Sequence, residues 1–425
     1  MLVRSITLAS DSFSTTVPLD DHANAIHAVA RQGALQSLPS PSIVITYQNN
    51  LPTMLNNPVI SADAVWTQGS GASYEITGNL TIDSGFTLSL QPGSTLALES
   101  GGQLIVNGTL VIAGTEASPV VLGSASSVSG SWSGVVLNPG GALQLDYATI
   151  EYADTGITFN GGSATVGNST LQSSGEGARI NAGTPTLQTN LIQDNDNDGI
   201  YIGGNPGDAA VITGNTLINN GANGIHVAGA SPQIQANTIE SNFTNGVRFS
   251  GSAGQLASLV GNTVRNNLEH GLLIQSAAPI VDGNTVSDNQ MSGIYVQGSA
   301  AAGTQLLNNT VASNVEKGLL IDSSAPQIQG NTIEHNQEQG IYLQGGTGTT
   351  PAISANTIRF NDLAGIHLLG NFVAGEGPQP IINNNQFIEN GIGGATTVGQ
   401  HLELESYDEC CTPALKIDAT NNWWG

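Results

Sequence analysis

The chain has 425 residues, of which 54 are glycine and only 9% are charged. Its 32 acidic residues outnumber eight lysines and arginines, and the formal net charge of −24 disfavours binding to nucleic acid or to anionic membranes. No run of about 18 apolar residues occurs, so the sequence predicts no transmembrane segment.

Residues 1–63 do not follow the repeat that dominates the rest of the chain, and we expect them to form an N-terminal cap and lead-in. One short helix is predicted between Leu19 and Leu35, because Asp20 or Asp21 can cap its start and Gly33 can end it. Such a helix would cover the apolar end of a solenoid. The alternatives are a contact with a partner and the remnant of an upstream domain.

The stretch from Tyr74 to Leu122 alternates apolar and polar residues around glycine-rich turns, which is typical of short strands. Two transitional segments follow, Asp146–Phe159 and Ala164–Ile180, without the full asparagine pattern of the later chain. Ser169 stands where an asparagine stands one coil later.

From residue 185 to residue 370 one pattern recurs: an asparagine, a second asparagine five residues later, and a glycine nine residues after the first. Successive starts alternate between intervals of 25 and 22 residues, so the full unit is a 47-residue pair of coils. The eight regular copies begin at Asn190, Asn215, Asn237, Asn262, Asn284, Asn309, Asn331 and Asn356, and a looser one begins at Asn385.

Apolar residues occupy three fixed places in each coil, as in Ile212, Leu217 and the triplet Ile225-His226-Val227. Three short strands in every 22 to 25 residues predict an all-β fold, a single-stranded right-handed parallel β-helix of three sheets and roughly a dozen coils. Asparagine carries both a donor and an acceptor, so we expect the asparagines to satisfy turn backbone groups and to bond one another from coil to coil. The glycine column suits a left-handed or crowded backbone position.

This pattern resembles the β-helix repeat of the pectin-lyase-like superfamily, including the carbohydrate-binding and sugar-hydrolase domains of secreted bacterial proteins. The resemblance covers about residues 64–425, with regular units at 185–370 and looser coils and longer loops at 370–425. It implies the fold but not one activity, because that superfamily holds lyases, hydrolases, epimerases and non-catalytic surface proteins. The ending Asn421-Asn422-Trp423-Trp424-Gly425 resembles a motif after which such chains usually continue, so a longer protein is expected.

The outward residue of the triplet after each glycine is the best candidate for a binding surface. Tyrosine and histidine there could stack on sugar rings, and arginine could bind a carboxylate. The alternative is cross-strand packing of exposed aromatics. The predicted carbohydrate-binding residues are Tyr201, His226, Arg248, Tyr295, Tyr342 and His367.

Asp194, Asp196 and Asp198 alternate before Gly199, which resembles the opening of a calcium loop. Asn205 stands where such a loop would place its bidentate glutamate, so the alternative is an acidic surface turn. No cofactor is required by the sequence, and calcium is the one metal considered. Two outward pairs one coil apart, Glu240 with Arg265 and Glu334 with Arg359, predict exposed salt bridges.

The near-identity of the repeats favours a non-catalytic extracellular module that binds polysaccharide or a cell-surface glycan, or that serves as an adhesive or structural scaffold able to self-associate. The alternative is a polysaccharide lyase or glycoside hydrolase whose site lies where the repeat breaks, around Gly370–Gln379 or Gly391–Pro413. No catalytic residues are identified in the sequence. The start of the chain lacks the apolar core of a signal peptide, so either secretion uses a signal outside this sequence or the extracellular assignment is wrong.

Overall fold

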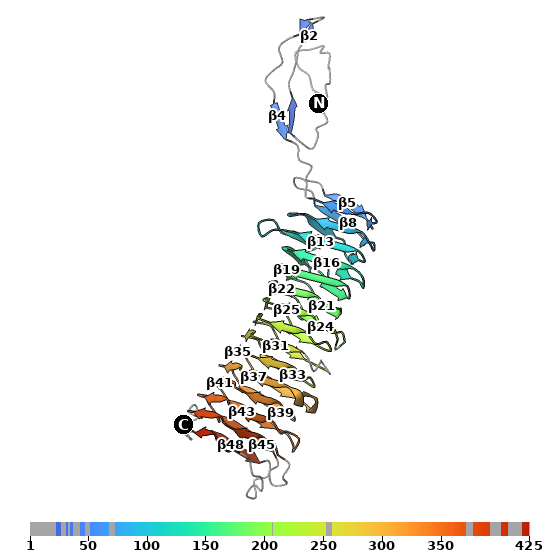
Figure 1. The fold of residues 1–425 in the computed structure, drawn as a ribbon. Helices are drawn as coiled ribbons and strands as arrows, with labels where there is room; N and C mark the ends of the chain where they lie inside the picture. The colour runs from blue at the N-terminus through green and yellow to red at the C-terminus, as the bar shows by residue number, and fades with distance from the viewer. Residues whose placement is uncertain are drawn as a thin grey trace.

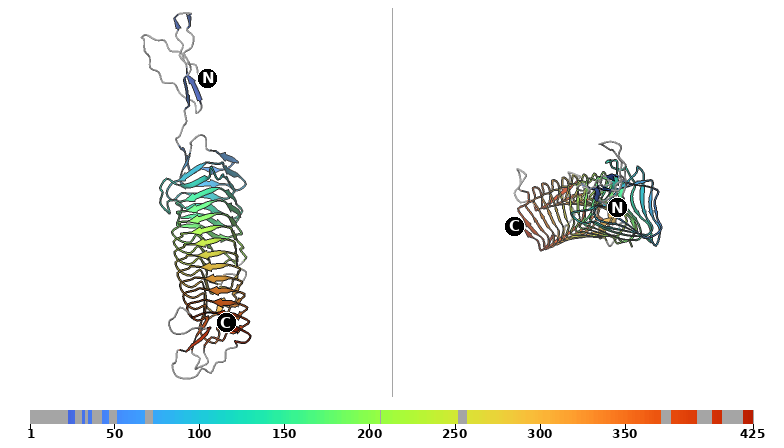
Figure 2. Two further views of the ribbon diagram at one scale, coloured as in Figure 1. Left: turned by 90° about the vertical axis from the view of Figure 1, so that its left-hand side faces the viewer. Right: turned by 90° about the horizontal axis from the view of Figure 1, so that it is seen from above.

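The computed structural model describes residues 52–67, 73–205, 207–251, 257–370, 377–391, 401–406 and 419–424, together with four short strands before residue 52. From β5 onward the chain winds into a rod of stacked coils, seen from the side in Figure 1 and from two further directions in Figure 2. All strand pairs of the rod are parallel, and each coil places one strand in each of three long sheets. This is the predicted three-sheet parallel β-helix.

The 14-stranded sheet contains β7 (Ala64–Trp66), β10 (Thr87–Leu90), β13 (Thr109–Ala113), β16 (Ala142–Asp146), β19 (Ser163–Gly167), β22 (Thr186–Gln188), β25 (Val211–Thr213), β28 (Gln233–Gln235), β31 (Ser258–Val260), β34 (Ile280–Asp282), β37 (Gln305–Leu307), β40 (Gln327–Gln329), β43 (Ala352–Ser354) and β46 (Ile381–Asn383).

The 16-stranded sheet contains β5 (Thr53–Asn56), β8 (Tyr74–Thr77), β11 (Thr95–Leu98), β14 (Val120–Ser124), β17 (Ala148–Glu151), β20 (Thr170–Gln172), β23 (Leu191–Gln193), β26 (Thr216–Ile218), β29 (Thr238–Glu240), β32 (Thr263–Arg265), β35 (Thr285–Ser287), β38 (Thr310–Ala312), β41 (Thr332–Glu334), β44 (Thr357–Arg359), β47 (Gln386–Ile388) and β49 (Trp423–Trp424).

The 15-stranded sheet contains β6 (Val59–Ile60), β9 (Leu80–Ile82), β12 (Gln103–Val106), β15 (Gly134–Leu137), β18 (Thr155–Asn160), β21 (Glu176–Ala182), β24 (Ile200–Ile202), β27 (Ile225–Val227), β30 (Val247–Phe249), β33 (Leu272–Gln275), β36 (Ile294–Gln297), β39 (Leu319–Asp322), β42 (Ile341–Gln344), β45 (Ile366–Gly370) and β48 (Leu402–Ser406). In all three sheets the inward side chains of each coil stack on their equivalents and form one continuous core.

The predicted N-terminal helix is wrong. Within Leu19–Leu35 the structure has strands β1 (Ala23–Ile26) and β2 (Arg31–Gln32); β1 pairs antiparallel with β4 (Ile43–Thr46), and β2 pairs with β3 (Leu35–Gln36). The reason lies in β4, where all four residues are β-branched and therefore favour a strand. Pairing with β4 holds Ala23–Ile26 extended, so this segment does not form a helix.

Strands β5 and β6 lie before residue 64 and already pair with strands of the rod. The predicted domain boundary at residue 64 stays a prediction. The one helix among the described residues is η1, a 3-10 turn at Ser299–Gly303. None of the described helices is long and apolar enough to span a membrane.

Two asparagine ladders run along the two corners of the rod that flank the 16-stranded sheet, and they confirm the predicted role of these residues. Asn284 is buried; its Nδ2 donates to the carbonyl of Leu259 at 2.8 Å and to Oδ1 of Asn309 at 3.0 Å. Its own Oδ1 accepts from the backbone and side-chain nitrogens of Asn262. Ser169 begins this ladder by donating its backbone N–H to Asn190, as its position predicts.

The glycine column is crowded rather than left-handed. A Cβ on Gly246 would lie 2.3 Å from a methyl carbon of Val264 and 2.8 Å from the carbonyl oxygen of Gly271, so no larger residue fits without movement. The left-handed positions instead precede the asparagines, as at Ala236 (φ 53°) and Ser241 (φ 56°).

Candidate functional site

The predicted binding residues lie in a single file on the outer face of the 15-stranded sheet, which confirms their register. Strand pairing aligns each of them with its equivalent in the next coil. We call this file the outer column, and it consists of Arg179, Tyr201, His226, Arg248, Leu273, Tyr295, Leu320, Tyr342, His367 and Glu403. Their role in binding stays a prediction.

Neighbours in the outer column pack against one another. The Arg179 guanidinium lies 4.3 Å from the centre of the Tyr201 ring, and that ring meets His226 edge to face at 5.2 Å. Near the other end, the rings of Tyr342 and His367 stack at 4.8 Å with an angle of 15° between their planes. Nδ1 of His367 lies 2.9 Å from Oε2 of Glu403. Side-chain contacts therefore connect neighbouring coils near both ends of the column.

A second file of polar residues, which the sequence analysis missed, occupies the position just before the glycine in seven of the eight regular coils. We call it the pre-glycine column: Asp198, Asn223, Asn245, His270, Ser292, Lys317 and Gln339. Asn223 Nδ2 donates to Asp198 at 2.8 Å, and Asn245 Nδ2 donates to Asn223 at 3.0 Å. In the sequence, this column is visible only as a polar residue before the glycine in seven coils. The pattern is hard to recognise because the residue type differs from coil to coil.

The two columns touch at several coils and so form one strip along the rod. Nδ1 of His226 lies 3.2 Å from Oδ2 of Asp198. The rings of His270 and Tyr295 are 5.2 Å apart, and Nζ of Lys317 lies 5.6 Å from the centre of the Tyr342 ring. The strip therefore combines aromatic rings, cations and hydrogen-bonding groups.

Near the C-terminal end of the rod the strip hollows into a cavity of about 320 Å³. Tyr342, His367 and Leu320 line it from the outer column, and Lys317 and Gln339 line it from the pre-glycine column. Glu338, which lies 2.6 Å from Nζ of Lys317, and Gln344 complete the wall.

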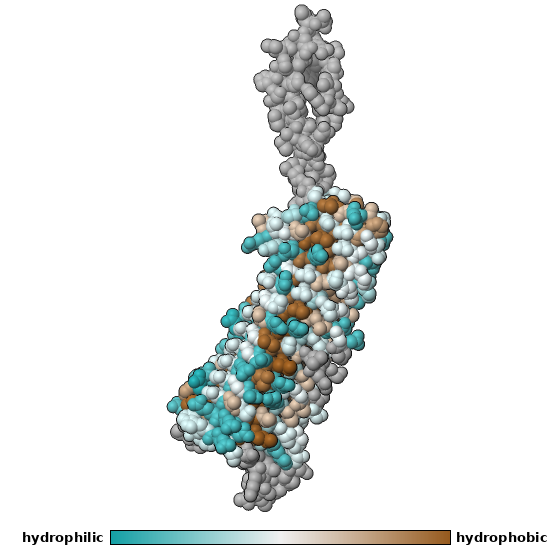
Figure 3. All heavy atoms as spheres, viewed as in Figure 1, coloured by the Kyte–Doolittle hydropathy of each residue, from teal (hydrophilic) through white to brown (hydrophobic). Residues whose placement is uncertain are grey.

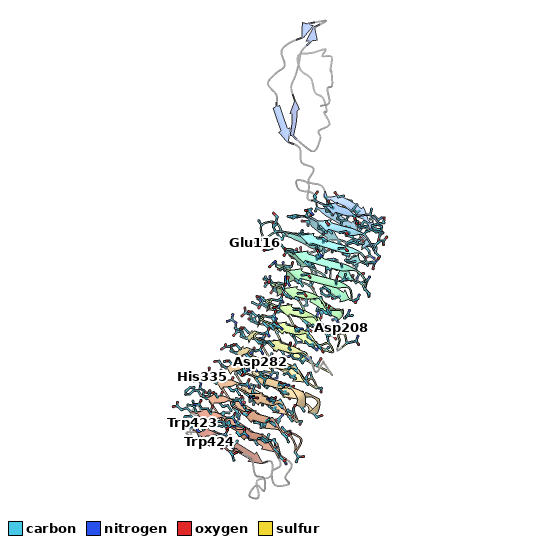
Figure 4. The ribbon with its side chains drawn as sticks, viewed as in Figure 1. Glu116, Asp208, Asp282, His335, Trp423 and Trp424 are labelled. Carbon is cyan, nitrogen blue, oxygen red and sulfur yellow. The ribbon has the colours of Figure 1, made fainter. Side chains whose placement is uncertain are left out.

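A larger hollow of about 530 Å³ lies beside the 16-stranded sheet, where Thr357, Asn385 and Trp423 contribute to its wall. Its lining contains no acid, base or histidine, so it offers less chemistry than the smaller cavity. Figure 4 shows that Trp423 and Trp424 lie at the C-terminal end of the rod. Trp424 stacks on Phe387 at 4.5 Å.

Burial shifts the pKa of several groups in and beside the strip. It raises the pKa of Glu176 to about 7, although Arg179 at 2.7 Å opposes the shift. Burial also lowers the pKa of His270 and, together with the nearby Asp322, raises that of Tyr295 to about 12. For Asp198 burial acts upward, but hydrogen bonds from His226 and Asn223 outweigh it and lower the pKa.

The predicted calcium residues differ in burial. Asp194 and Asp196 are exposed, whereas Asp198 is buried and bonded to Asn223 and His226. Across the part of the chain that the structure describes, no three acids, histidines or cysteines gather closely enough to hold a metal. Calcium binding by these aspartates stays a prediction.

The predicted salt bridges are confirmed, with Nε–Oε2 distances of 2.6 Å for Arg265–Glu240 and Arg359–Glu334. The alternative catalytic region falls largely on residues 371–376, 392–400 and 407–418, which lie outside the described residues. Glu403 is described and joins the outer column through His367.

Comparison with solved structures finds similar chains at low sequence identity. The A-module of the mannuronan C-5 epimerase AlgE4 from Azotobacter vinelandii is 14% identical with a TM-score of 0.44, covering 83% of this chain and 91% of that one. The tailspike protein of E. coli bacteriophage HK620, solved in complex with a pentasaccharide, is 11% identical with a TM-score of 0.40, covering 81% and 71%. Comparison with curated proteins finds no match.

A family model described as "Right handed beta helix region" matches residues 109–258 and again residues 245–406. Together the two matches span well over half of the chain, in agreement with its three parallel sheets. The chain belongs to the right-handed β-helix family.

Proposed function

We propose that this chain is an extracellular module that binds polysaccharide along the strip on its 15-stranded sheet. The observation that carries the proposal is the cavity of about 320 Å³, where the stacked rings of Tyr342 and His367 lie beside the ammonium group of Lys317. An aromatic surface next to hydrogen-bonding groups matches a sugar, which has apolar ring faces and hydroxyl edges.

The strip is also long enough for a chain of sugars. Neighbouring coils are about 4.8 Å apart, so a linear polymer lying along the rod would meet a new pair of side chains at each coil. Tyr201, His226, Arg248 and Tyr295 would extend the contact from the cavity toward the N-terminal coils.

The cationic side chains of the strip indicate which class of glycan it would bind. Arg179, Arg248 and Lys317 all lie on the strip, although the chain as a whole is strongly acidic. Arg179 and Lys317 already pair with Glu176 and Glu338, whereas Arg248 donates to the neutral Gln275. We therefore expect glycans with carboxylate-bearing sugars to bind more tightly than neutral ones, because guanidinium and ammonium groups pair with carboxylates.

The test is titration of the full chain with neutral and uronate-containing polysaccharides, followed by calorimetry or affinity electrophoresis. Tyr342→Ala should weaken binding about fivefold, because a ring contact contributes about 1 kcal/mol. Phe360→Ala is the matched control, since Phe360 stacks on His335 at 5.2 Å on another corner of the rod. Figure 4 labels His335 at the edge of the rod. Equal affinity of all three proteins, or no retention of any glycan, would contradict the proposal.

A second candidate is a lyase or hydrolase that acts on the bound glycan, favoured by the contact between His367 and Glu403 at the cavity. This pair could move a proton beside a sugar held on Tyr342. Unsaturated or reducing ends released in the same titrations, and lost in Glu403→Gln, would support it. Binding without any released ends would leave the module as a binder only.

Self-association would use a different face. Figure 3 shows a band of apolar side chains along the axis of the rod. Val65, Val260 and Ile381 are exposed on strands of the 14-stranded sheet. Sedimentation of the full chain at rising concentration tests this predicted behaviour.

A further inference from the structure

Three side chains from successive coils form a serine–histidine–aspartate arrangement on the strip. Oγ of Ser250 lies 2.8 Å from Nε2 of His226, and Nδ1 of the same ring lies 3.2 Å from Oδ2 of Asp198. His226 is on β27, Ser250 follows β30, and Asp198 precedes β24. These are the two contacts that connect a serine nucleophile, its general base and the acid that orients the base.

The hydrogen bonds fix where the imidazole proton lies. Oδ1 of Asp198 accepts from both the backbone and side-chain nitrogens of Asn223, at 2.9 and 2.8 Å. A carboxylate can only accept, so Nδ1 of His226 must carry the proton that faces Oδ2. Nε2 of the neutral ring is then the acceptor for the Ser250 hydroxyl, which is the arrangement for removing the serine proton.

The arrangement breaks the repeat. Ser250 lies four residues after the glycine of its coil, and no other regular coil has serine there: the equivalents are Gly203, Ala228, Gln275, Gln297, Asp322, Gln344 and Leu369. A residue needed only for folding would recur in the stack, as the asparagines do. Ser250 and His226 are half-buried, with 17% of the His226 side chain exposed, whereas Asp198 is buried.

Arg248 supplies a cation beside the serine. It pairs with His226 across the two strands and lies two residues before Ser250, so that both side chains point away from the core. Its Nη2 donates to Gln275, whereas its buried Nε has no hydrogen-bond partner among the described residues. A buried donor without an acceptor is costly, and an oxygen that gains negative charge during a reaction would satisfy it.

We propose that Ser250, His226 and Asp198 form an acyl-transfer site that hydrolyses carboxylic esters, with O-acyl groups on glycans as its substrates. The assignment of the glycan rests on the proposed function, because Tyr201, beside His226, belongs to the same outer column as the cavity. The triad chemistry itself does not depend on it.

The reaction needs only the ester and water. Oγ of Ser250 attacks the ester carbonyl carbon while its proton moves to Nε2 of His226, and Arg248 stabilises the oxyanion. The bond from this carbon to the sugar oxygen then breaks, and His226 gives its proton to that oxygen, releasing the sugar hydroxyl. Water attacks the acyl-serine in the same way, releases the carboxylic acid, and returns the proton to Oγ. Asp198 orients the ring and stabilises its charged form throughout.

The first experiment uses the full chain with 4-nitrophenyl acetate and with a fluorophosphonate that labels activated serines. We expect ester hydrolysis and a single label on the peptide containing Ser250. Ser250→Ala should abolish both, and His226→Ala should lower the rate about a hundredfold or more. Ser287→Ala, an outward serine of the 16-stranded sheet, is the matched control and should keep wild-type values. Thermal unfolding of each variant shows that it is folded.

Two results would overturn the site: no label on wild-type Ser250, or hydrolysis that survives in Ser250→Ala. The second experiment offers an O-acetylated polysaccharide and its chemically deacetylated form and measures released acetate. Release that needs Ser250 supports the glycan ester as substrate. Cleavage of the small ester without release of acetate from the glycan would overturn that substrate while leaving the triad and the binding strip intact.

Discussion

The asparagine ladders and the outer column stack side chains through the same coils, yet the ladders repeat one residue and the outer column varies. Asn237, Asn262 and Asn284 are all buried and make equivalent bonds to backbone and to the next asparagine. The outer column mixes arginine, tyrosine, histidine, leucine and glutamate, and most of its members are half-buried, whereas Leu273 and His367 are buried. In a solenoid, repetition identifies what every coil needs, and variation identifies where single residues act.

The largest effect is expected in the asparagine ladder. Asn284→Ala should lower the free energy of unfolding by about 3 kcal/mol, because it removes the donor to Leu259 and the acceptor for Asn262 inside the protein. Chemical denaturation measures the loss. Thr285→Ala, at the neighbouring exposed position, should change stability by less than about 0.5 kcal/mol. Equal effects at the two positions would mean that the ladder contributes nothing beyond its surroundings.

The next effect is a pH dependence of the free energy of unfolding, caused by Glu176 beside the strip. Burial raises the pKa of Glu176 from 4.5 to about 7, so between these values the folded chain holds a proton that the unfolded chain has released. Raising the pH through this window therefore destabilises wild type, by up to about 3 kcal/mol, and the loss levels off above pH 7. Glu176→Gln should lack this slope, whereas Glu240→Gln should retain it. Parallel stability profiles of wild type and Glu176→Gln between pH 4.5 and 8 would contradict the assignment.

The smallest effect is expected at the exposed pair of Glu240 and Arg265. Its atoms are only 2.6 Å apart, but 47% of the arginine side chain is exposed to water. A double-mutant cycle with alanine at both positions should give a coupling energy below about 1 kcal/mol, which falls further in high salt. A larger coupling energy that does not change with salt would show that exposed pairs on the outer faces contribute substantially to the stability of the rod.

The regular coils could be predicted from the sequence because their signals are local and repeated. The spacing of asparagine and glycine fixed the register at Asn190 as well as at Asn356, and Ser169 could be placed by analogy. The N-terminal stretch could not, because Ala23–Ile26 becomes a strand only through its pairing with residues about twenty positions later. Local helix signals carry no information about such a partner.

The outer column was predictable for the same reason as the fold, since its members keep a fixed distance from the glycines. The contacts between columns were not. Asp198 looked like part of a calcium loop because its neighbours Asp194 and Asp196 alternate with it, whereas its hydrogen bonds go to residues of the next coil. Ser250 gave no signal at all, because a single serine acquires meaning only from a histidine 24 positions away.

The alternation of 22 and 25 residues in the ladder has a consequence for length. Each asparagine meets an identical one on both sides, and asparagines 47 positions apart stand in equivalent surroundings, so a two-coil unit is interchangeable with the next. Deleting or inserting 47 residues in register would shorten or lengthen the rod by about 10 Å while every remaining amide still finds its counterpart. The length of the rod can therefore change in steps of one two-coil unit, but not by single residues.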